Sequence, residues 1–413
     1  MLYDLLAIVS FVYGVILSLR VKTFDSVLTY LIVILLLIPR TIYLPGVPGF
    51  SVHSVSVCVM LFIFFMRRVF LRDESINLYF QHRDYFMFLF IVYVLFLSWS
   101  YNRTSGIPIL FENYFIPSLF LIFICSNVST LKGNHLKLMV NIGVMISIYA
   151  IVEYITRYNI IYRDHYADLT WFGEYRELAT VFRVSSTIGH PLMLSSFLLP
   201  LLPFTNTTRW PALSRFLLLI GILVTGARSA ALIAGGYIAL HILWNKKLGQ
   251  LILLVVAGFF IISYGSQIPI IDGLFHRFEH ATHSSEIRYI VFESLPVLVR
   301  ESFWGHGLRS SEFMFSQLIG LDYVVENPWI SLLLEIGIVG LLFYCAMMLV
   351  WVSRIGFNRT HIAPTALIIA MISGYNSIAV NTNLLLYTII LLSCIKNRYE
   401  EKDEKSSTSG LFA

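Results

Sequence analysis

The chain has 413 residues, of which 57% are hydrophobic and only 13% are charged. A soluble domain carries about 25% charged residues, so this composition excludes a single water-soluble core and indicates a chain that crosses a lipid bilayer repeatedly. The net charge of +5 comes from cations scattered through short connections. That pattern sets orientation in a membrane and excludes a nucleic-acid-binding surface.

Apolar segments long enough to span a bilayer recur along the chain and predict an all-α, polytopic integral membrane protein. Within residues 1–266 the candidate spans are 3–19, 25–44, 51–66, 85–101, 107–125, 136–156, 189–206, 214–226, 229–245 and 250–266. Within residues 328–396 they are 328–352, 362–380 and 383–396. The spans that meet at Thr225–Arg228 are short, so they form either one broken helix or a tight hairpin, and the expected total is about 12–13 helices.

Two long polar segments and a polar tail lie between and after these spans. We expect an external loop at 157–188, a large external loop with short helices at 267–327, and a disordered cytoplasmic tail at 397–413, where charge mixes with Ser and Thr. When the loops are assigned alternately to the two sides, every lysine falls on one side, which is therefore cytoplasmic. The cations of the opposite side are all arginine.

This sorting of cations indicates an external anionic ligand. A guanidinium presents a rigid fork of donors that matches phosphate, and it stays charged when partly buried. The alternative for any single arginine is that it reaches toward lipid headgroups or pairs with a neighbouring acid. For the whole set we favour a phosphate carried by a lipid.

The large loop contains local signals for two helix starts. Ser284 or Ser285 can cap an amphipathic helix through Arg300, with Arg288 in its first turn, where a helix N-terminus and a guanidinium together suit an anion. Further along, Gly305-His306-Gly307 allows a sharp turn after Trp304. Asn327 can cap the next membrane helix, and Pro328 suits its first turn.

Two other sets of side chains are weaker candidates. His276, Glu279, His280 and His283 share one helical face, but the sequence offers no second ligand set, so we expect solvated histidines and no bound metal. All four cysteines lie in apolar segments without a metal-ligand spacing, so we expect free thiols packed as small hydrophobic groups.

Four stretches, in order, carry a resemblance to a known family. They are Arg183 to Pro191, Thr225 to Ala230, Arg288 through Gly305-His306-Gly307, and Glu326-Asn327 followed by Leu333, Glu335, Gly337, Gly340 and Leu341. Together they resemble the O-antigen ligase and Wzy polymerase superfamily of bacterial membrane glycosyltransferases, over about residues 180–345. The first six spans match only in general character.

The resemblance implies a GT-C-like enzyme of the bacterial cytoplasmic membrane whose active site faces the periplasm or the cell exterior. Its substrate would be an oligosaccharide linked to undecaprenyl diphosphate, and no metal or other cofactor would be needed. Arg183, Arg228 and Arg288 match the arginines that hold the lipid diphosphate. Arg228 and Arg288 are also the expected catalytic cations, because fixed guanidiniums stabilise the charge that develops on a diphosphate leaving group.

The chain departs from the ligases of this family at one position. Ligases carry a His-Asn pair where the chain enters the helix after the large loop, and here Glu326 stands in the histidine position while Asn327 is retained. A carboxylate can serve as the base for an acceptor hydroxyl, so Glu326 is the expected catalytic base. The alternatives are that Glu326 pairs with an external arginine or that His306 is the base.

The loss of the ligase histidine favours a Wzy-like polysaccharide polymerase. It would join lipid-linked repeat units into capsule, exopolysaccharide or O-antigen, with membrane lipids around it, Trp304 stacking on sugar rings, and a flippase and chain-length regulator as partners. One alternative is a ligase that passes finished glycan to lipid A-core, teichoic acid or protein. Others are a transporter, which would place ionisable residues at mid-membrane, and a non-catalytic scaffold.

Overall fold

In the computed structural model the described residues are 2–20, 24–47, 49–73, 76–101, 104–127, 131, 134–167, 182–244, 267, 289–320, 327–356, 359–374 and 382–409. Over these ranges the fold is helical, with one isolated bridge between Tyr43 and Ser51. The chain divides into two compact units. The first comprises Met1–Met139, Glu293–Ala363 and Tyr375–Ala413, and the second comprises Val140–Phe292 and Pro364–Gly374.

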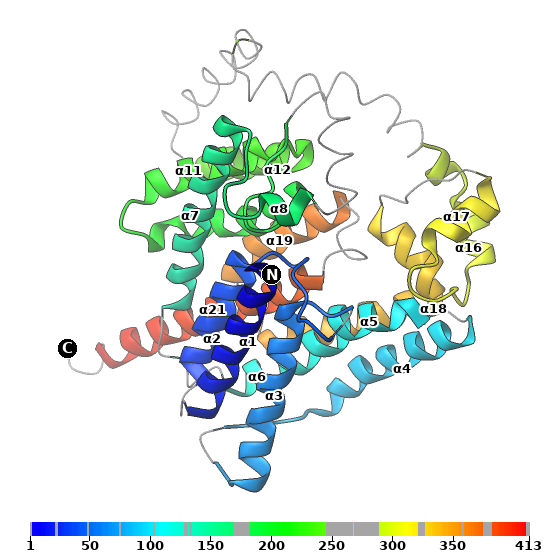
Figure 1. Cartoon of the computed structure of the whole chain (residues 1–413), viewed down its shortest axis with the longest axis horizontal. Coiled ribbons are helices and arrows are strands. Elements are labelled where there is room, and N and C mark those ends of the chain that lie inside the picture. Colours follow the sequence, from blue (N-terminus) through cyan, green and yellow to red (C-terminus); the bar gives the residue numbers. More distant parts are fainter. Residues whose placement is uncertain are drawn as a thin grey trace. The chain divides into compact units, whose positions relative to one another are not determined.

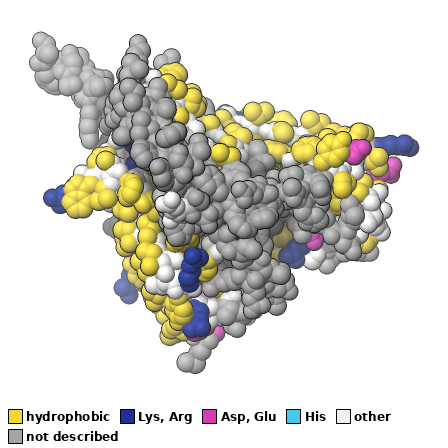
Figure 2. Space-filling model, turned by 90° about the horizontal axis from the view of Figure 1, so that it is seen from above, with side chains coloured by type: hydrophobic (Ala, Val, Ile, Leu, Met, Phe, Trp, Pro, Cys, Tyr) yellow, Lys and Arg dark blue, Asp and Glu magenta, His cyan; other side chains and the backbone are white. Residues whose placement is uncertain are grey.

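Within the described residues, six helical stretches are long and apolar enough to cross a membrane. They are α1 (Leu2–Arg20), α3 (Val52–Phe70), η1 with α4 (His82–Ser100), α5 to α6 (Ile107–Asn127), α7 (His135–Thr156) and α18 (Pro328–Ile355). Shorter apolar helices occur in α2 (Phe24–Leu37), α11 (Pro211–Val224), α12 (Arg228–Trp244), α19 (Arg359–Gly374) and α21 (Thr382–Ser409). Figure 2 shows hydrophobic side chains over much of the described surface that it presents. These features fit a multi-pass membrane protein.

The total of about 12–13 helices stays a prediction. The expected span at 250–266 and the parts of the expected large loop at 268–288 and 321–326 lie outside the described residues. All four cysteines are free, as expected, although the side chains of Cys58 and Cys345 are exposed.

The first unit packs around aromatic rings and a buried ion pair. Phe24 of α2 contacts Phe64 of α3 and Phe123 of α6, with ring centroids 6.1 and 4.9 Å away. In Figure 1, α4 runs alongside α18. Near the C-terminal end of α18, the Arg354 Nε donates to Asp84 Oδ1 at 2.8 Å, and both side chains are buried. A buried charge pair of this kind fixes one end of α4 against α18.

The second unit packs α7 against α10 (Pro191–Leu198), η5 (Leu199–Thr207) and α11. A Cβ on Gly143 of α7 would lie 2.5 Å from Leu201, and one on Gly221 of α11 would lie 2.5 Å from Ser147 of α7. These glycines let the helices approach closely. The span predicted at 189–206 consists of the α-helix α10 followed by the 3₁₀ segment η5. The α-helix does not continue, because Pro200 and Pro203 have no N–H to donate to an α-helical hydrogen bond.

Two local predictions differ from the structure. The helix expected through Arg300 is interrupted at Ser294 and resumes as α16 (Leu295–Glu301), because Pro296 lacks the N–H that a continuous helix requires. At the other end of the chain, α21 continues to Ser409, where a disordered tail was expected from residue 397. The helix continues there because the stretch is rich in glutamate and lysine, which have good helix propensity.

Candidate functional site

Arg183 and the turn before Arg228 come together in the second unit. The Arg183 Nε donates to the Thr225 carbonyl oxygen at 3.1 Å, although 42 residues separate the two in sequence. The Arg183 side chain is only 7% exposed. Its guanidinium therefore stabilises the end of α11 and the turn that follows.

The turn places Arg228 at the start of a helix. Thr225 Oγ1 accepts from the Ala227 N–H at 3.2 Å, and Gly226 has a φ of +63°, which an L side chain rarely adopts. Arg228 is the first residue of α12 and is partly exposed. α11 and α12 are separate helices that this turn joins, and they are in contact with each other.

A buried carboxylate fixes the segment that carries Arg183. Glu153, near the end of α7, is fully buried. Its two oxygens accept from the Ser185 N–H at 3.4 Å and the Ser186 N–H at 2.8 Å, and Oε2 also accepts from Asn159 Nδ2 at 3.0 Å. Ser186 has a φ of +50°. The carboxylate thus holds the backbone directly after Arg183 in a strained conformation.

Further cations and aromatic rings surround this segment. The Arg157 guanidinium lies 4.7 Å from the centre of the Tyr154 ring and 5.1 Å from that of Phe182, which directly precedes Arg183. Arg163, the first residue of α8 (Arg163–Ala167), lies 4.7 Å above the Tyr158 ring. Cation–π contacts of this kind leave donors of the guanidinium edge available to a ligand. The end of the unit at which α7 finishes therefore carries two arginines beside the acids Glu153 and Asp164.

The arrangement suits an anion such as phosphate. The positive end of the α12 dipole points out of the helix at Arg228, and Arg228 adds a full charge at the same place. Arg183 fixes the turn that positions both. We call the group Arg183, Thr225, Gly226 and Arg228 the arginine turn.

The first unit holds Trp304, His306 and Asn327. The loop after α16 packs its backbone directly on α18: a Cβ on Gly305 would lie 2.4 Å from the Ile336 carbonyl carbon. The Glu335 carbonyl accepts from the N–H groups of His306 at 3.0 Å and Gly307 at 2.8 Å. As expected, Gly305 and Gly307 form a sharp turn, with φ values of +85° and +86°.

This backbone contact coincides with a break in α18. Gly337 has a φ of +70° and a ψ of −178°, which is not helical, and its nearest neighbours are backbone atoms of Gly305, Trp304 and Phe303. The Ile338 N–H donates to the Phe303 carbonyl at 3.0 Å, and the hydroxyl of Tyr93 donates to the Trp304 carbonyl at 2.6 Å. The loop is therefore seated at the break.

The predicted supporting side chains have different surroundings in this unit. Trp304 is 61% exposed, which leaves its ring open to a sugar. His306 is partly exposed, and its Nε2 lies 3.3 Å from the Glu301 carbonyl oxygen. Asn327 Oδ1 accepts from the N–H groups of Trp329 and Ile330, at 3.0 and 3.3 Å, with Pro328 in the first turn of α18. The predicted Asn327 cap is confirmed.

Two acids that sequence reasoning did not assign to the site are structurally prominent. Glu153 fixes the Arg183 segment, and Glu335 accepts from the Ser311 hydroxyl at 3.0 Å, at the start of α17 (Ser311–Ile319). Both are buried. The signal that could have found them is a lone carboxylate within an apolar span, since such a charge is costly unless hydrogen-bonded.

Arg288 and Glu326 lie outside the described residues, as do His276, Glu279, His280 and His283. Their roles therefore stay predictions. Among the described residues no group of three or more histidine, cysteine, aspartate and glutamate side chains is arranged to hold a metal ion. Comparison with known proteins finds no family model, curated protein or solved structure that matches the chain.

Proposed function

We propose that the protein is a polysaccharide polymerase that transfers a lipid-linked oligosaccharide repeat unit from undecaprenyl diphosphate to a hydroxyl of an acceptor lipid-linked glycan. The observation that carries the proposal is the Arg183–Thr225 hydrogen bond. The bond joins Arg183 to the turn that leads to Arg228, so two of the three arginines that the family resemblance singles out adjoin one turn beside the N-terminus of α12. That neighbourhood suits a diphosphate.

The proposed reaction breaks one bond and forms one. An oxygen of the acceptor hydroxyl attacks the anomeric carbon of the donor, and the bond from that carbon to the diphosphate oxygen breaks. The diphosphate leaves on the lipid with its negative charge, which Arg228 and Arg288 stabilise. The hydroxyl proton goes to Glu326, with His306 as the alternative base. No metal ion or other cofactor is required by this scheme.

The buried position of Arg183 separates its role from that of Arg228. Because Arg183 is 7% exposed and its Nε is committed to the Thr225 carbonyl, we assign it to diphosphate binding mainly through the turn that it holds. Of these two arginines, Arg228, which is partly exposed, is the one that touches the leaving group. Trp304 would stack on a sugar of either glycan, and Asn327 positions the start of α18 next to Glu326.

The test of the arginine turn is Arg228→Ala in a strain that lacks the chromosomal gene. We expect polymer synthesis to fall about 100-fold or more, because loss of one preorganised donor to a developing negative charge has an effect of roughly that size. Arg209→Ala is the matched control: Arg209 is exposed and flanks α11 at its other end. Glycan length is read on gels at equal protein levels. Full-length polymer from Arg228→Ala would contradict the proposal.

The identity of the base is tested by comparing Glu326→Gln with His306→Gln. Removal of a general base lowers a rate by about 100- to 10,000-fold, so we expect the glutamate variant to lose activity and the histidine variant to retain most of it. The measurement is elongation of a lipid-linked repeat unit by purified protein as a function of pH. The reverse result would make His306 the base, and transfer to lipid A-core, teichoic acid or protein would identify a ligase.

A further inference from the structure

An apolar groove lies on the first unit, and none of the residues that line it belongs to the arginine turn. It is a cavity of about 320 Å³ between α3, α6 (Ile116–Asn127) and the connection that follows α3. Phe65 of α3, Phe80 of the connection and Phe123 of α6 form parts of its wall. This volume is at the lower end of the range of ligand-binding pockets, about 300–1,000 Å³.

The groove opens onto a surface suited to the bilayer interior. Phe62, Phe65 and Phe80 line it and are 59%, 48% and 51% exposed. Because α3 is long and apolar enough to cross a membrane, rings exposed on it are in the environment of lipid chains. The groove can therefore be filled from the bilayer without passage through water.

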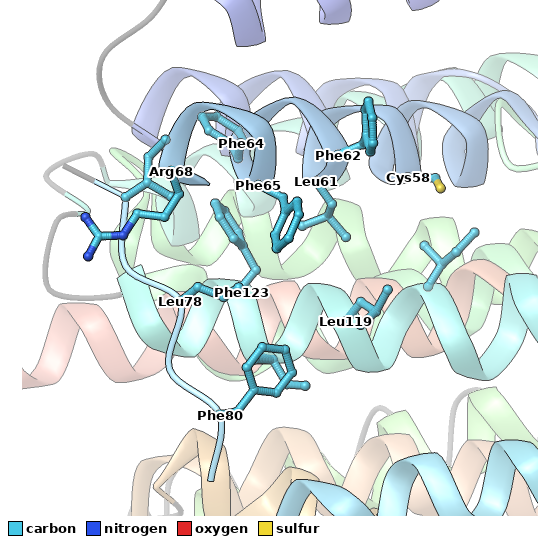
Figure 3. Close-up of a pocket in the computed structure, with 13 residues that line it drawn as sticks. Cys58, Leu61, Phe62, Phe64, Phe65, Arg68, Leu78, Phe80, Leu119 and Phe123 are labelled. Atoms are coloured by element: carbon cyan, nitrogen blue, oxygen red, sulfur yellow. The ribbon is translucent and has the colours of Figure 1, made fainter. Parts of the chain in front are cut away.

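One end of the groove is charged. Figure 3 shows Arg68 at one end of the lining residues on α3 and Cys58 at the other. Within the described part of the chain, Arg68 is the one charged residue among those that line the cavity. Its Nη1 donates to the Asp73 carbonyl oxygen at 3.2 Å, whereas the neighbouring Arg67 is committed to the Asp73 carboxylate at 2.6 Å.

The charge at this end is complementary to a phosphate. Arg67 and Arg68 stand in the last turn of α3 and Arg72 follows it in sequence, and Arg67 pairs with the Asp73 carboxylate. The Asp73 carboxylate is paired with Arg67, so Arg68 retains donors for an external anion. Basic residues directly beyond a membrane helix attract anionic lipids of the same leaflet.

We propose that this groove binds one acyl chain of an anionic glycerophospholipid, with the lipid phosphate at Arg68. The chain would lie along α3 between the rings of Phe65, Phe80 and Phe123, and the phosphate would accept from the guanidinium. The site does not depend on the glycosyltransferase proposal, since none of its residues belongs to the arginine turn.

The experiment measures lipid retained by the purified full-length chain. Native mass spectrometry counts phosphatidylglycerol and phosphatidylcholine with identical acyl chains, each added at the same concentration. We expect the wild type to retain phosphatidylglycerol preferentially and Arg68→Gln to lose about tenfold in apparent affinity for it, because a charge-assisted contact is removed. Arg209→Gln, which removes a positive charge from the second unit, is the control, and its apparent affinity for phosphatidylglycerol should equal that of the wild type.

A second variant tests the cavity itself. Leu119 lines it from α6, and Leu119→Trp should fill it and abolish preferential phosphatidylglycerol binding while the thermal midpoint in detergent shows that the protein is folded. Equal retention of the two lipids by the wild type, or unchanged binding in both variants, would overturn the proposal. Displacement of phosphatidylglycerol by substoichiometric undecaprenyl phosphate would also overturn it, because the groove would then prefer that lipid. A dimer of the wild type that is lost in Leu119→Trp would overturn it too, because a second copy of the chain would then fill the groove.

Discussion

Two loops in this protein are held in place by different means. In the second unit, the segment after Arg183 is held through a side chain: the Glu153 carboxylate accepts from the N–H groups of Ser185 and Ser186. In the first unit, the loop around His306 is held mainly through backbone, with Gly305 against Gly337 and the Glu335 carbonyl accepting two N–H groups. A loop held by a carboxylate is sensitive to charge, whereas a loop held by backbone contact is sensitive to volume.

The largest expected effect comes from adding volume at the backbone contact. In Gly337→Ala the new Cβ would lie 2.4 Å from the Gly305 nitrogen, at a φ of +70°, so we expect a loss of about 3 kcal/mol or more in the free energy of unfolding. The measurement is denaturant unfolding of the purified protein in detergent. Gly320→Ala is the control for backbone strain alone, since Gly320 has a φ of +77° and a Cβ there would meet no atom of the described residues within 4 Å, apart from its chain neighbours.

For Gly320→Ala we expect a loss of about 1 kcal/mol. If the two alanine variants lose the same free energy, close contact between Gly305 and Gly337 is not what holds the His306 loop. The comparison of the two loops would then fail in the first unit.

A smaller effect is expected from removing charge without changing shape. Glu153→Gln replaces one carboxylate oxygen by an NH₂ group that cannot accept from the Ser185 or Ser186 N–H, so we expect a loss of about 2 kcal/mol. Glu335→Gln should lose less, about 1 kcal/mol, because its carbonyl still accepts from His306 and Gly307. Unfolding measurements on both variants check the order. The opposite order would mean that the side chain of Glu335 is the main restraint on its loop.

An effect on stability as small as that of Glu335→Gln is expected at Arg183. Arg183→Lys removes the Nε donor to the Thr225 carbonyl, a loss of about 1 kcal/mol, and we expect faster hydrogen exchange confined to the arginine turn. Arg215→Lys is the control, since Arg215 is in the same unit and donates to Thr205. Unchanged exchange at residues 225–228 in Arg183→Lys would show that the turn does not depend on this bond.

Features set by neighbouring residues could be predicted from the sequence. The Asn327 cap, Pro328 in the first turn and the sharp turn at Gly305 and Gly307 all depend on local backbone preferences, and the structure has them. The apolar spans are likewise recognisable because hydrophobic length is a property of one segment. Pro296, which interrupts the helix before Arg300, is itself a local signal of a break, because proline cannot donate to a helical hydrogen bond.

Features set by tertiary contact could not be predicted. The break at Gly337 lies inside a 28-residue apolar helix, and nothing beside it in sequence signals a break, because its cause is contact with Gly305. The same holds for the Arg183–Thr225 bond, whose partners are 42 residues apart. The arginines could thus be recognised as candidates from the family resemblance, but the bracing role of Arg183 required the fold.

The break in α18 has a consequence for how the His306 loop can move. A helix that breaks inside an apolar layer strands polar main-chain groups, and here the loop satisfies them: Phe303 accepts from Ile338, and His306 and Gly307 donate to Glu335. Withdrawal of the loop would leave these groups without partners where water is scarce, at a cost of about 1–3 kcal/mol for each. The loop therefore leaves at the lowest cost if α18 straightens at the same time, because helical hydrogen bonds would then replace those that the loop supplies.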